Sequence, residues 1–268
     1  MKILALGGSG GMGRYAVKYL HNIKQINKIY VADLNFLSAK KFASHFDSRV
    51  EGLKLDIRDF QSLKIEMSKV DIVVNTTGPF FLFAETILRA AIQTNTHYFD
   101  ICDDWEPTEA MLQMHEEAKK ANITAIIGLG ASPGLTNILA RIAISELDEV
   151  RKVYTGWDMS AAKPESESSQ SEISAAMVHG IEQMIGEVKV FKNGNFEMVK
   201  PLKKIKFDYP DIGKRKAYIF GHPEALTFPY YFRDIKESYN LMHGGENSFI
   251  VIIFKIPIKL FSPPCIKL

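Results

Sequence analysis

Three glycines near the N-terminus, Gly8, Gly10 and Gly13, constrain the fold of this 268-residue chain more than any other feature. They fit the pattern G-x-G-x-x-G, which here follows a predicted strand, Ile3–Leu6, and opens a predicted helix, Gly11–Asn22. In this context the first glycine permits a tight turn, the second lets the backbone approach a pyrophosphate, and the third lets the helix pack closely. The diphosphate is then expected on the free N–H groups of the helix N-terminus. The expected contacts of this dinucleotide cofactor are Gly8, Ser9, Gly10, Gly11, Met12 and Gly13.

An acidic residue stands at the end of the second predicted strand, Lys28–Ala32. This residue, Asp33, follows the last glycine by about 20 positions, the spacing at which a carboxylate binds the adenosine ribose hydroxyls. We expect Asp33 and Leu34 to hold the adenosine end of the cofactor, NAD or NADP. The carboxylate repels a 2′-phosphate and no arginine follows within three residues, which favours NAD, although Lys40 and Lys41 could reach a phosphate.

Strand-like and helical stretches alternate through the first half of the chain. This alternation predicts right-handed βαβ units, and so a Rossmann-type, doubly wound parallel sheet of the α/β class. The predicted strands are Ile3–Leu6, Lys28–Ala32, Val50–Leu55, Asp71–Asn75, His97–Phe99 and Ile123–Ile127, and the predicted helices are Gly11–Asn22, Leu37–Phe46, Ala84–Gln93 and Pro107–Ala121.

The pattern changes from about Val150 onward. A strand, Val153–Met159, is followed by a polar stretch, Lys163–Ser171, and by a helix, Ile173–Ile185, with one apolar stripe. Three further strand-like segments follow, and an Asn193–Gly194 hairpin turn separates two of them. We therefore expect a second, α+β domain on a mixed or antiparallel sheet. The expected limits are 1–130 for the cofactor domain, 131–248 for a substrate and dimerisation domain, and 249–268 for an atypical C-terminal segment, while the strand-like segments are Glu187–Phe191, Phe196–Val199 and Ile205–Tyr209.

Composition argues against several classes of partner. The formal net charge is +2, so no strong field favours nucleic acid or an anionic membrane. No run approaches the roughly 20 apolar residues of a membrane span, and the apolar run Ile3–Leu6 is too short for a signal peptide. Two cysteines and no metal-ligand spacing argue against a disulfide framework and a metal site. A cytoplasmic protein is expected.

Two more segments are expected to line the cofactor groove. Asp56 and Ile57 follow the third strand, where the adenine ring is expected. Thr76, Thr77, Gly78 and Pro79 follow the fourth strand, at the edge where ligands bind in open α/β sheets. An ordinary strand-to-helix turn explains the second segment equally well.

A second glycine register, Gly7, Gly10 and Gly13, fits the G-x-x-G-x-x-G pattern of short-chain dehydrogenases. Those enzymes use a Tyr-x-x-x-Lys pair, in which the lysine lowers the pKa of the tyrosine. No tyrosine of this chain is followed four positions later by lysine, so the catalytic half of that interpretation is missing.

Four sequence blocks in this order resemble the saccharopine dehydrogenase-like oxidoreductases, in the branch similar to saccharopine reductase. The resemblance covers about residues 1–245. It implies hydride transfer at a carbon–nitrogen bond, with NADPH or NADH, of an amino-acid-like substrate held between the two domains. It also implies a homodimer formed through the second domain. The blocks are Val73–Phe80, His97–Asp100, Gly128–Gly134 and Gly221–Glu224.

Residues that suit such chemistry are few. Asp100 ends a strand and is the candidate catalytic residue, able to orient an amine or pass a proton, or simply to cap a helix. Ser132, Pro133 and Gly134 read as an N-cap followed by proline, and a helix start there could bind a substrate carboxylate. An ordinary helix cap explains them equally well. His222 lies in a turn and is interpreted as structural.

The last 20 residues match nothing in the family. Phe249–Phe254 is apolar, and the segment is either a buried strand or the end of a truncated chain. Because no proton donor is evident, a non-catalytic dinucleotide-binding protein, with a second domain for dimerisation or partner binding, is the alternative to an oxidoreductase.

Overall fold

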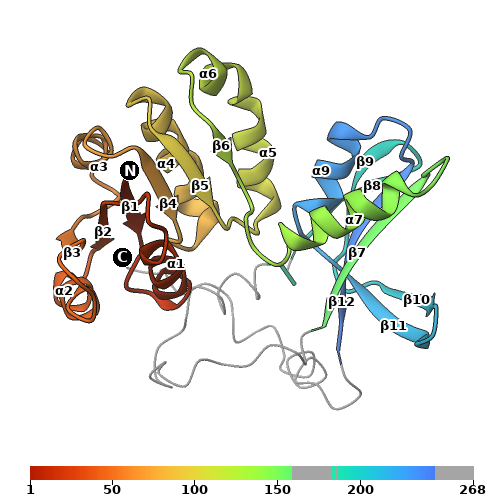
Figure 1. Ribbon diagram of the computed structural model, residues 1–268. Coiled ribbons are helices and arrows are strands. Elements are labelled where there is room, and N and C mark those ends of the chain that lie inside the picture. The colour runs from red at the N-terminus through yellow and green to blue at the C-terminus, as the bar shows by residue number, and fades with distance from the viewer. Residues whose placement is uncertain (159–182, 185, 245–268) are drawn as a thin grey trace.

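The computed structural model describes residues 1–158, 183–184 and 186–244, and these form two domains that lie side by side (Figure 1). The first domain has a six-stranded parallel sheet in the order β3-β2-β1-β4-β5-β6. This order reverses direction between β1 and β4, as in a Rossmann fold. Its strands are β1 (Lys2–Leu6), β2 (Lys28–Asp33), β3 (Val50–Lys54), β4 (Ile72–Asn75), β5 (His97–Asp100) and β6 (Ala125–Ile126).

Helices cover both faces of this sheet because successive residues of β1 point to opposite sides. Ile3 and Ala5 pack with α1 and α2, whereas Leu4 and Leu6 pack with α3, α4 and α5. All four side chains are at most 2% exposed. The helices are α1 (Gly11–His21), α2 (Phe36–Ala43), α3 (Phe60–Met67), α4 (Phe80–Gln93), α5 (Trp105–Gln113) and α6 (His115–Lys120).

The second domain has a mixed sheet. The antiparallel order is β10-β11-β12-β8-β9, and β7 pairs with β12 in parallel. Phe228 of α9 packs with Val153 of β7, and Ala140 and Ile144 of α7 join this cluster. The elements are α7 (Leu135–Ser145), β7 (Lys152–Asp158), β8 (Val188–Lys192), β9 (Asn195–Val199), β10 (Lys204–Tyr209), β11 (Gly213–Phe220), α9 (Glu224–Tyr231) and β12 (Glu237–His243).

The predicted fold class is confirmed, with differences in single elements. The helix expected over Pro107–Ala121 is two helices, α5 and α6, and the helix expected over Leu37–Phe46 ends at Ala43. Sequence patterns did not predict α3, α9, β11 and β12. The predicted polar stretch Lys163–Ser171, most of the predicted helix Ile173–Ile185 and the C-terminal segment 249–268 lie outside the described residues. Within the described ranges, no helix is long and apolar enough to cross a membrane.

Candidate functional site

The glycine loop between β1 and α1 is built by close backbone contacts. A Cβ added to Gly13 would lie 2.1 Å from the Gly7 carbonyl oxygen, so only glycine lets α1 approach β1 this closely. The tight turn was expected at Gly8, but the left-handed backbone is at Gly7, with φ +67°. Gly8 is required for a different reason, since its Cβ would lie 2.9 Å from the Ala5 carbonyl oxygen.

The N-terminus of α1 faces solvent. Gly10, Gly11 and Met12 are exposed. In the described part of the chain no side chain caps this helix, and its first turn carries no acidic residue. The first N–H groups of a helix have no intrahelical acceptor and attract anions. The segment therefore offers a diphosphate the donors that the sequence predicted.

The end of β2 lies against this loop. The Ser9 hydroxyl donates to Asp33 Oδ2 at 2.5 Å, and the Asn35 amide donates to Asp33 Oδ1 at 3.0 Å. Arg14 Nε donates to the Ser9 carbonyl at 2.7 Å, and its guanidinium lies over the Phe42 ring. Asp33 is therefore held beside the loop, where the ribose was expected, and Arg14 is a nearby cation that sequence patterns did not single out.

The turn after β4 closes the same edge. The Thr76 hydroxyl donates to the Leu6 carbonyl at 2.8 Å, which fixes this turn against β1. Thr77 Oγ1 is buried and has no hydrogen-bond partner within residues 1–158, 183–184 and 186–244. It points at the glycine loop, since a Cβ on Gly7 would lie 2.9 Å from it. Gly78 and Pro79 lead into α4, whose N-cap is Pro79. An orphaned buried hydroxyl beside a glycine loop fits a bound dinucleotide.

In the turn after β3, Asp56 is hydrogen-bonded to a neighbouring residue in the sequence. Arg58 donates to both carboxylate oxygens of Asp56, at 2.9 Å from Nε and 2.8 Å from Nη2. The side-chain hydrogen bond from Arg58 is the main cause that lowers the pKa of Asp56 to about 2. Ile57 packs partly buried against the core, and Leu34 at the end of β2 is 56% exposed. Ile57 and Leu34 present apolar surface suited to an adenine ring.

Asp100, the candidate catalytic residue, is 1% exposed and lies in a buried polar network. Its carboxylate accepts hydrogen bonds from the Tyr98 hydroxyl at 2.8 Å and from the amides of Cys102 at 3.0 Å and Gly128 at 2.7 Å. Asn75 Nδ2 donates to the Tyr98 hydroxyl at 3.1 Å. Burial raises the pKa of Asp100 to about 6, although these hydrogen bonds oppose the rise. This geometry favours a positioning role at the start of the interdomain segment.

Ser132 does not cap a helix, contrary to expectation. Helix α7 begins at Leu135 with Gly134 as N-cap, and Asn137 Oδ1 accepts a hydrogen bond from the Gly134 amide at 2.9 Å. Gly134 has φ +122°, a conformation that only glycine adopts easily. Pro133 precedes the helix instead of opening it, and its side chain packs near Gly128. The Ser132 side chain is therefore free to point into the second domain.

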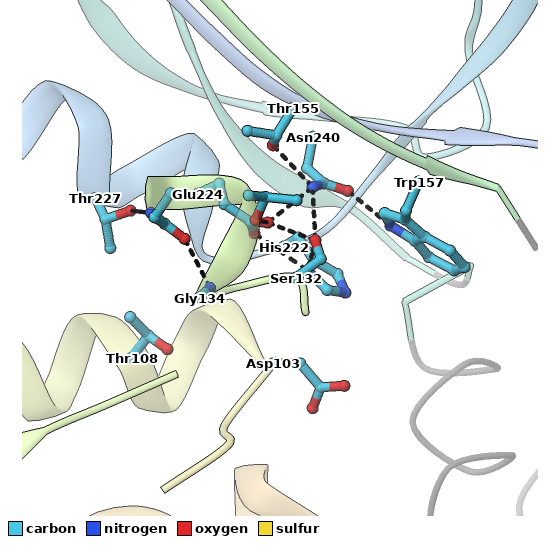
Figure 2. A network of polar contacts seen from close by, with 12 residues as sticks. Asp103, Thr108, Ser132, Gly134, Thr155, Trp157, His222, Glu224, Thr227 and Asn240 are labelled. Carbon is cyan, nitrogen blue, oxygen red and sulfur yellow. Dashed lines mark hydrogen bonds and ion pairs between the residues drawn. The ribbon is translucent and has the colours of Figure 1, made fainter. Parts of the chain in front are cut away.

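Ser132 meets a fully buried carboxylate there, that of Glu224 at the start of α9 (Figure 2). Glu224 Oε1 accepts hydrogen bonds from Ser132 Oγ at 2.5 Å, Thr136 Oγ1 at 2.8 Å and Asn240 Nδ2 at 3.2 Å. Glu224 Oε2 lies 3.2 Å from His222 Nδ1. Burial pushes the pKa of Glu224 upward, but the charge and hydrogen bond of His222 and the Ser132 hydroxyl outweigh it and leave the pKa below its ordinary value. The sequence placed His222 and Glu224 in one block, and only the fold shows that they pair.

Gln183 connects this network to the first domain. It is 4% exposed, and its Nε2 donates to the Asp103 carbonyl at 3.2 Å and to Asp104 Oδ1 at 3.4 Å. Asp104 Oδ2 in turn accepts a hydrogen bond from the Phe81 amide at 2.9 Å, in the first turn of α4. Gln183 Oε1 is buried without a partner in the described part of the chain. A Cβ on Gly221 would lie 3.0 Å from this oxygen.

Metal-binding and thiol chemistry receive little support. Among the described residues no group of three or more histidine, cysteine or acidic side chains could hold a metal ion. Cys102 is buried, and burial is the main cause that raises the pKa of its thiol above the ordinary value. A thiol in this state is a poor nucleophile.

Comparison with known proteins supports the same interpretation. The family model of the saccharopine dehydrogenase NADP binding domain matches residues 3–126. The carboxynorspermidine synthase of Vibrio cholerae is 23% identical over 249 residues, which cover 85% of this chain and 59% of that protein. The saccharopine dehydrogenase [NADP(+), L-glutamate-forming] of Pyricularia oryzae is 27% identical over 145 residues, which cover 54% of this chain and 31% of that protein.

A solved structure shows the same fold. Apo saccharopine dehydrogenase (L-Glu forming) from Saccharomyces cerevisiae matches 90% of this chain with a TM-score of 0.62 and 19% sequence identity. The match covers 54% of that chain. The chain thus spans about half of the solved relative and 59% of the Vibrio cholerae protein.

Proposed function

Because residues 3–126 match the family model of the saccharopine dehydrogenase NADP binding domain, we propose that this chain is a saccharopine dehydrogenase-like, NAD(P)-dependent oxidoreductase. The reaction is a hydride transfer at the carbon–nitrogen bond of an amino-acid-derived substrate. One observation carries the proposal: the buried Thr77 hydroxyl, which has no hydrogen-bond partner among the described residues, faces the glycine loop beside the solvent-facing N-terminus of α1. When bound, the nicotinamide supplies or accepts the hydride.

The chain's own residues bind and orient the reactants. The amides of Gly11, Met12 and Gly13 at the start of α1 hold the diphosphate. Asp33 binds the ribose hydroxyls, and Thr77 donates to the cofactor near the edge that faces the second domain. The substrate lies between that edge and the second domain, where Gly128–Gly134 carries the chain across.

The preferred cofactor is NAD within this proposal. The Asp33 carboxylate already accepts hydrogen bonds from Ser9 and Asn35, so it is held in place and its charge repels a 2′-phosphate. Arg14, Lys40 and Lys41 are the cations that would favour NADP instead. Arg14 is the best placed of them, since it bonds to the Ser9 carbonyl.

Several sequence-based assignments remain part of the proposal. These are a role for Asp100 in the reaction, for which its burial favours positioning over direct catalysis, substrate binding at Ser132–Gly134, and the domain limits 1–130 and 131–248. Formation of a homodimer and a cytoplasmic location are proposals of the same kind. Light scattering of the purified protein tests the dimer, and microscopy of a tagged chain tests the location.

The activity is tested with NADH or NADPH and a panel of amino acids paired with oxo acids, by following the loss of absorbance at the nicotinamide band. Turnover of at least one pair is expected. If the protein binds a cofactor yet turns over no pair, the alternative of a non-catalytic dinucleotide-binding protein replaces this proposal. The burial of Asp100, the candidate catalytic residue, in a hydrogen-bonded network gives that alternative its support.

A further inference from the structure

We propose that His222 and Gln183 form a subsite for the reacting nitrogen of the substrate, in which His222 Nε2 carries the proton that this nitrogen gains or loses. The inference rests on the proposed function, because it adds a proton carrier to the hydride transfer at a carbon–nitrogen bond. Four observations carry it: the buried carboxylate of Glu224, the contacts that hold the His222 ring, the Gln183 oxygen that lacks a partner among the described residues, and the contacts that link Gln183 to the start of α4.

The charge of Glu224 needs a cationic partner. Its carboxylate is 0% exposed, and desolvation of an unpaired carboxylate costs several kcal/mol. Among the described residues, Oε1 receives hydrogen bonds from three neutral donors, Ser132, Thr136 and Asn240. In the described ranges, His222 is the one basic side chain that forms an ion pair with it. His222 is therefore the side chain placed to pair with this buried carboxylate.

The same contact fixes the tautomer of His222. Because Nδ1 lies 3.2 Å from Glu224 Oε2, Nδ1 carries the proton that donates to the carboxylate. The exchangeable position is then Nε2. The ring also packs between aromatic side chains, with centroid distances of 6.0 Å to Trp157 and 5.7 Å to Phe220. Figure 2 shows the far edge of the ring pointing away from Glu224, on the side of the network where Asp103 lies.

Gln183 Oε1 indicates a ligand beside this ring. The oxygen is buried and has no hydrogen-bond partner within the part of the chain that the structure describes, although the amide nitrogen of the same side chain is bonded. Leaving such an acceptor unpaired is unfavourable, so buried groups without a partner are typical of sites that complete their bonding with a ligand. The oxygen lies next to Gly221, the residue before His222. An N–H of an amine or iminium group would satisfy it.

Contacts connect this subsite to the cofactor edge. Gln183 bonds to Asp104, and Asp104 caps the Phe81 amide at the start of α4. That helix follows the turn that carries Thr77, the other buried hydroxyl or amide oxygen without a partner among the described residues. Gln183 is thus linked, through Asp104 and the start of α4, to the turn that carries Thr77.

The proton balance of the step is simple. In the direction of reduction, the imine carbon gains the hydride from the reduced cofactor and the C=N electron pair moves to nitrogen. That nitrogen takes the proton from Nε2 of the His222 imidazolium, which becomes neutral and is reprotonated from solvent. The products are a secondary amine and the oxidised cofactor. Oxidation runs the same step in reverse, with His222 as the base.

The test compares three variants of the full chain. His222→Gln keeps a donor toward Glu224 and should lower kcat by about 10²-fold or more, the usual effect of losing a general acid, with the NADH Kd within twofold of wild type. Gln183→Met should raise KM about tenfold and leave kcat within threefold. His115→Gln, at a histidine whose side chain is 69% exposed, is the matched control and should change neither. A His222→Gln variant that folds, by its thermal unfolding, and retains kcat within threefold overturns the proposal.

A second measurement does not depend on turnover. The chain has seven histidines, and with labelled histidine the ring signal missing from His222→Gln identifies His222 in NMR spectra. Addition of saccharopine, as a secondary-amine probe, to the NAD-loaded protein should shift this signal and leave that of His115 in place. An unmoved signal overturns the subsite. If no substrate pair is turned over but the signal shifts, the proposed activity fails and the nitrogen subsite stands.

Discussion

The Gly128 amide donates a hydrogen bond to the Asp100 carboxylate at 2.7 Å, and this contact ties the end of β5 to the segment that enters the second domain. The Leu129 amide adds a second tie, to the Asp100 carbonyl at 2.7 Å. Ser132 lies a few residues further along this segment. Its position therefore depends on the buried carboxylate of Asp100.

Asp100 should make folding stability fall as the pH rises. Burial raises its pKa to about 6, from 3.8 in a model compound, so the folded state holds the proton more tightly than the unfolded chain. Stability from this residue is full below pH 4 and is lost as the pH rises to about 6, by about 3 kcal/mol. In Asp100→Asn this loss is absent. Urea unfolding at pH 4 and pH 7 measures the free energy of unfolding of both proteins. Between these pH values the stability of Asp100→Asn relative to wild type should increase by about that amount.

The outcome that contradicts this prediction is equal pH dependence in the two proteins. Asp47 and Asp56 titrate in the opposite sense, since hydrogen bonds from Arg49 and Arg58 lower their pKa values, but both residues are present in wild type and variant. Their effect therefore cancels in the comparison.

Gly13→Ala should abolish tight cofactor binding. The new Cβ would lie 2.1 Å from the Gly7 carbonyl oxygen and 2.7 Å from Gly8 Cα, so α1 must move away from the loop that holds the diphosphate. We expect the affinity for NADH and NADPH, measured by fluorescence titration, to fall at least tenfold, and stability to fall by about 1–3 kcal/mol. Gly156→Ala is the control, because its Cβ would meet nothing nearer than 3.4 Å. Unchanged affinity in Gly13→Ala would falsify the assigned loop geometry.

The first domain was predictable because its signals are local. Strand, glycine loop and helix follow one another in sequence, and each of the six predicted strands corresponds to one of β1 to β6. The start of α7 was misjudged because Ser132 and Pro133 carry the usual signs of a helix start, whereas Gly134, with its φ of +122°, is the true cap. Local propensity does not reveal that Ser132 has a better partner, Glu224, 92 residues away.

Sequence patterns could not predict which strands pair in the second domain. The parallel pairing of β7 with β12 joins Val153 to Ser238, and no spacing rule connects residues so far apart. His222 was interpreted as structural since a lone histidine in a turn usually is, and the fold alone places it at the only buried ion pair among the described residues. Hydrophobic periodicity therefore could not predict which buried polar residues pair with each other, and the fold was needed to identify them.

Asp33→Ala should weaken NAD binding more than NADP binding. The carboxylate is expected to bind both ribose hydroxyls of NAD, and loss of a charged hydrogen-bond partner costs about 1.5–3 kcal/mol, or roughly tenfold or more in Kd. For NADP the loss is offset by relief of repulsion from the 2′-phosphate, and Arg14 remains nearby. Calorimetric titration measures both constants. Equal losses for the two cofactors contradict the NAD preference, and Asp148→Ala, at an exposed position, is the control.

The ion pair between Lys189 and Glu109 should couple the two domains weakly. Lys189 Nζ on β8 lies 2.5 Å from Glu109 Oε2 on α5, and it also lies 5.2 Å from the centroid of the Trp105 ring. The two side chains are 20% and 40% exposed, so solvent screens the pair, and a double-mutant cycle of Lys189→Met and Glu109→Gln should give a coupling free energy of about 0.5–1 kcal/mol. Lys189→Met should cost more than Glu109→Gln because it also removes the cation–π contact, by about 0.5–1 kcal/mol. Urea unfolding measures the free energy of unfolding of each variant in the cycle, and 0.5 M salt should reduce the coupling free energy. A coupling indistinguishable from zero at low salt, or equal costs for the two single variants, would show that this contact does not hold α5 against β8.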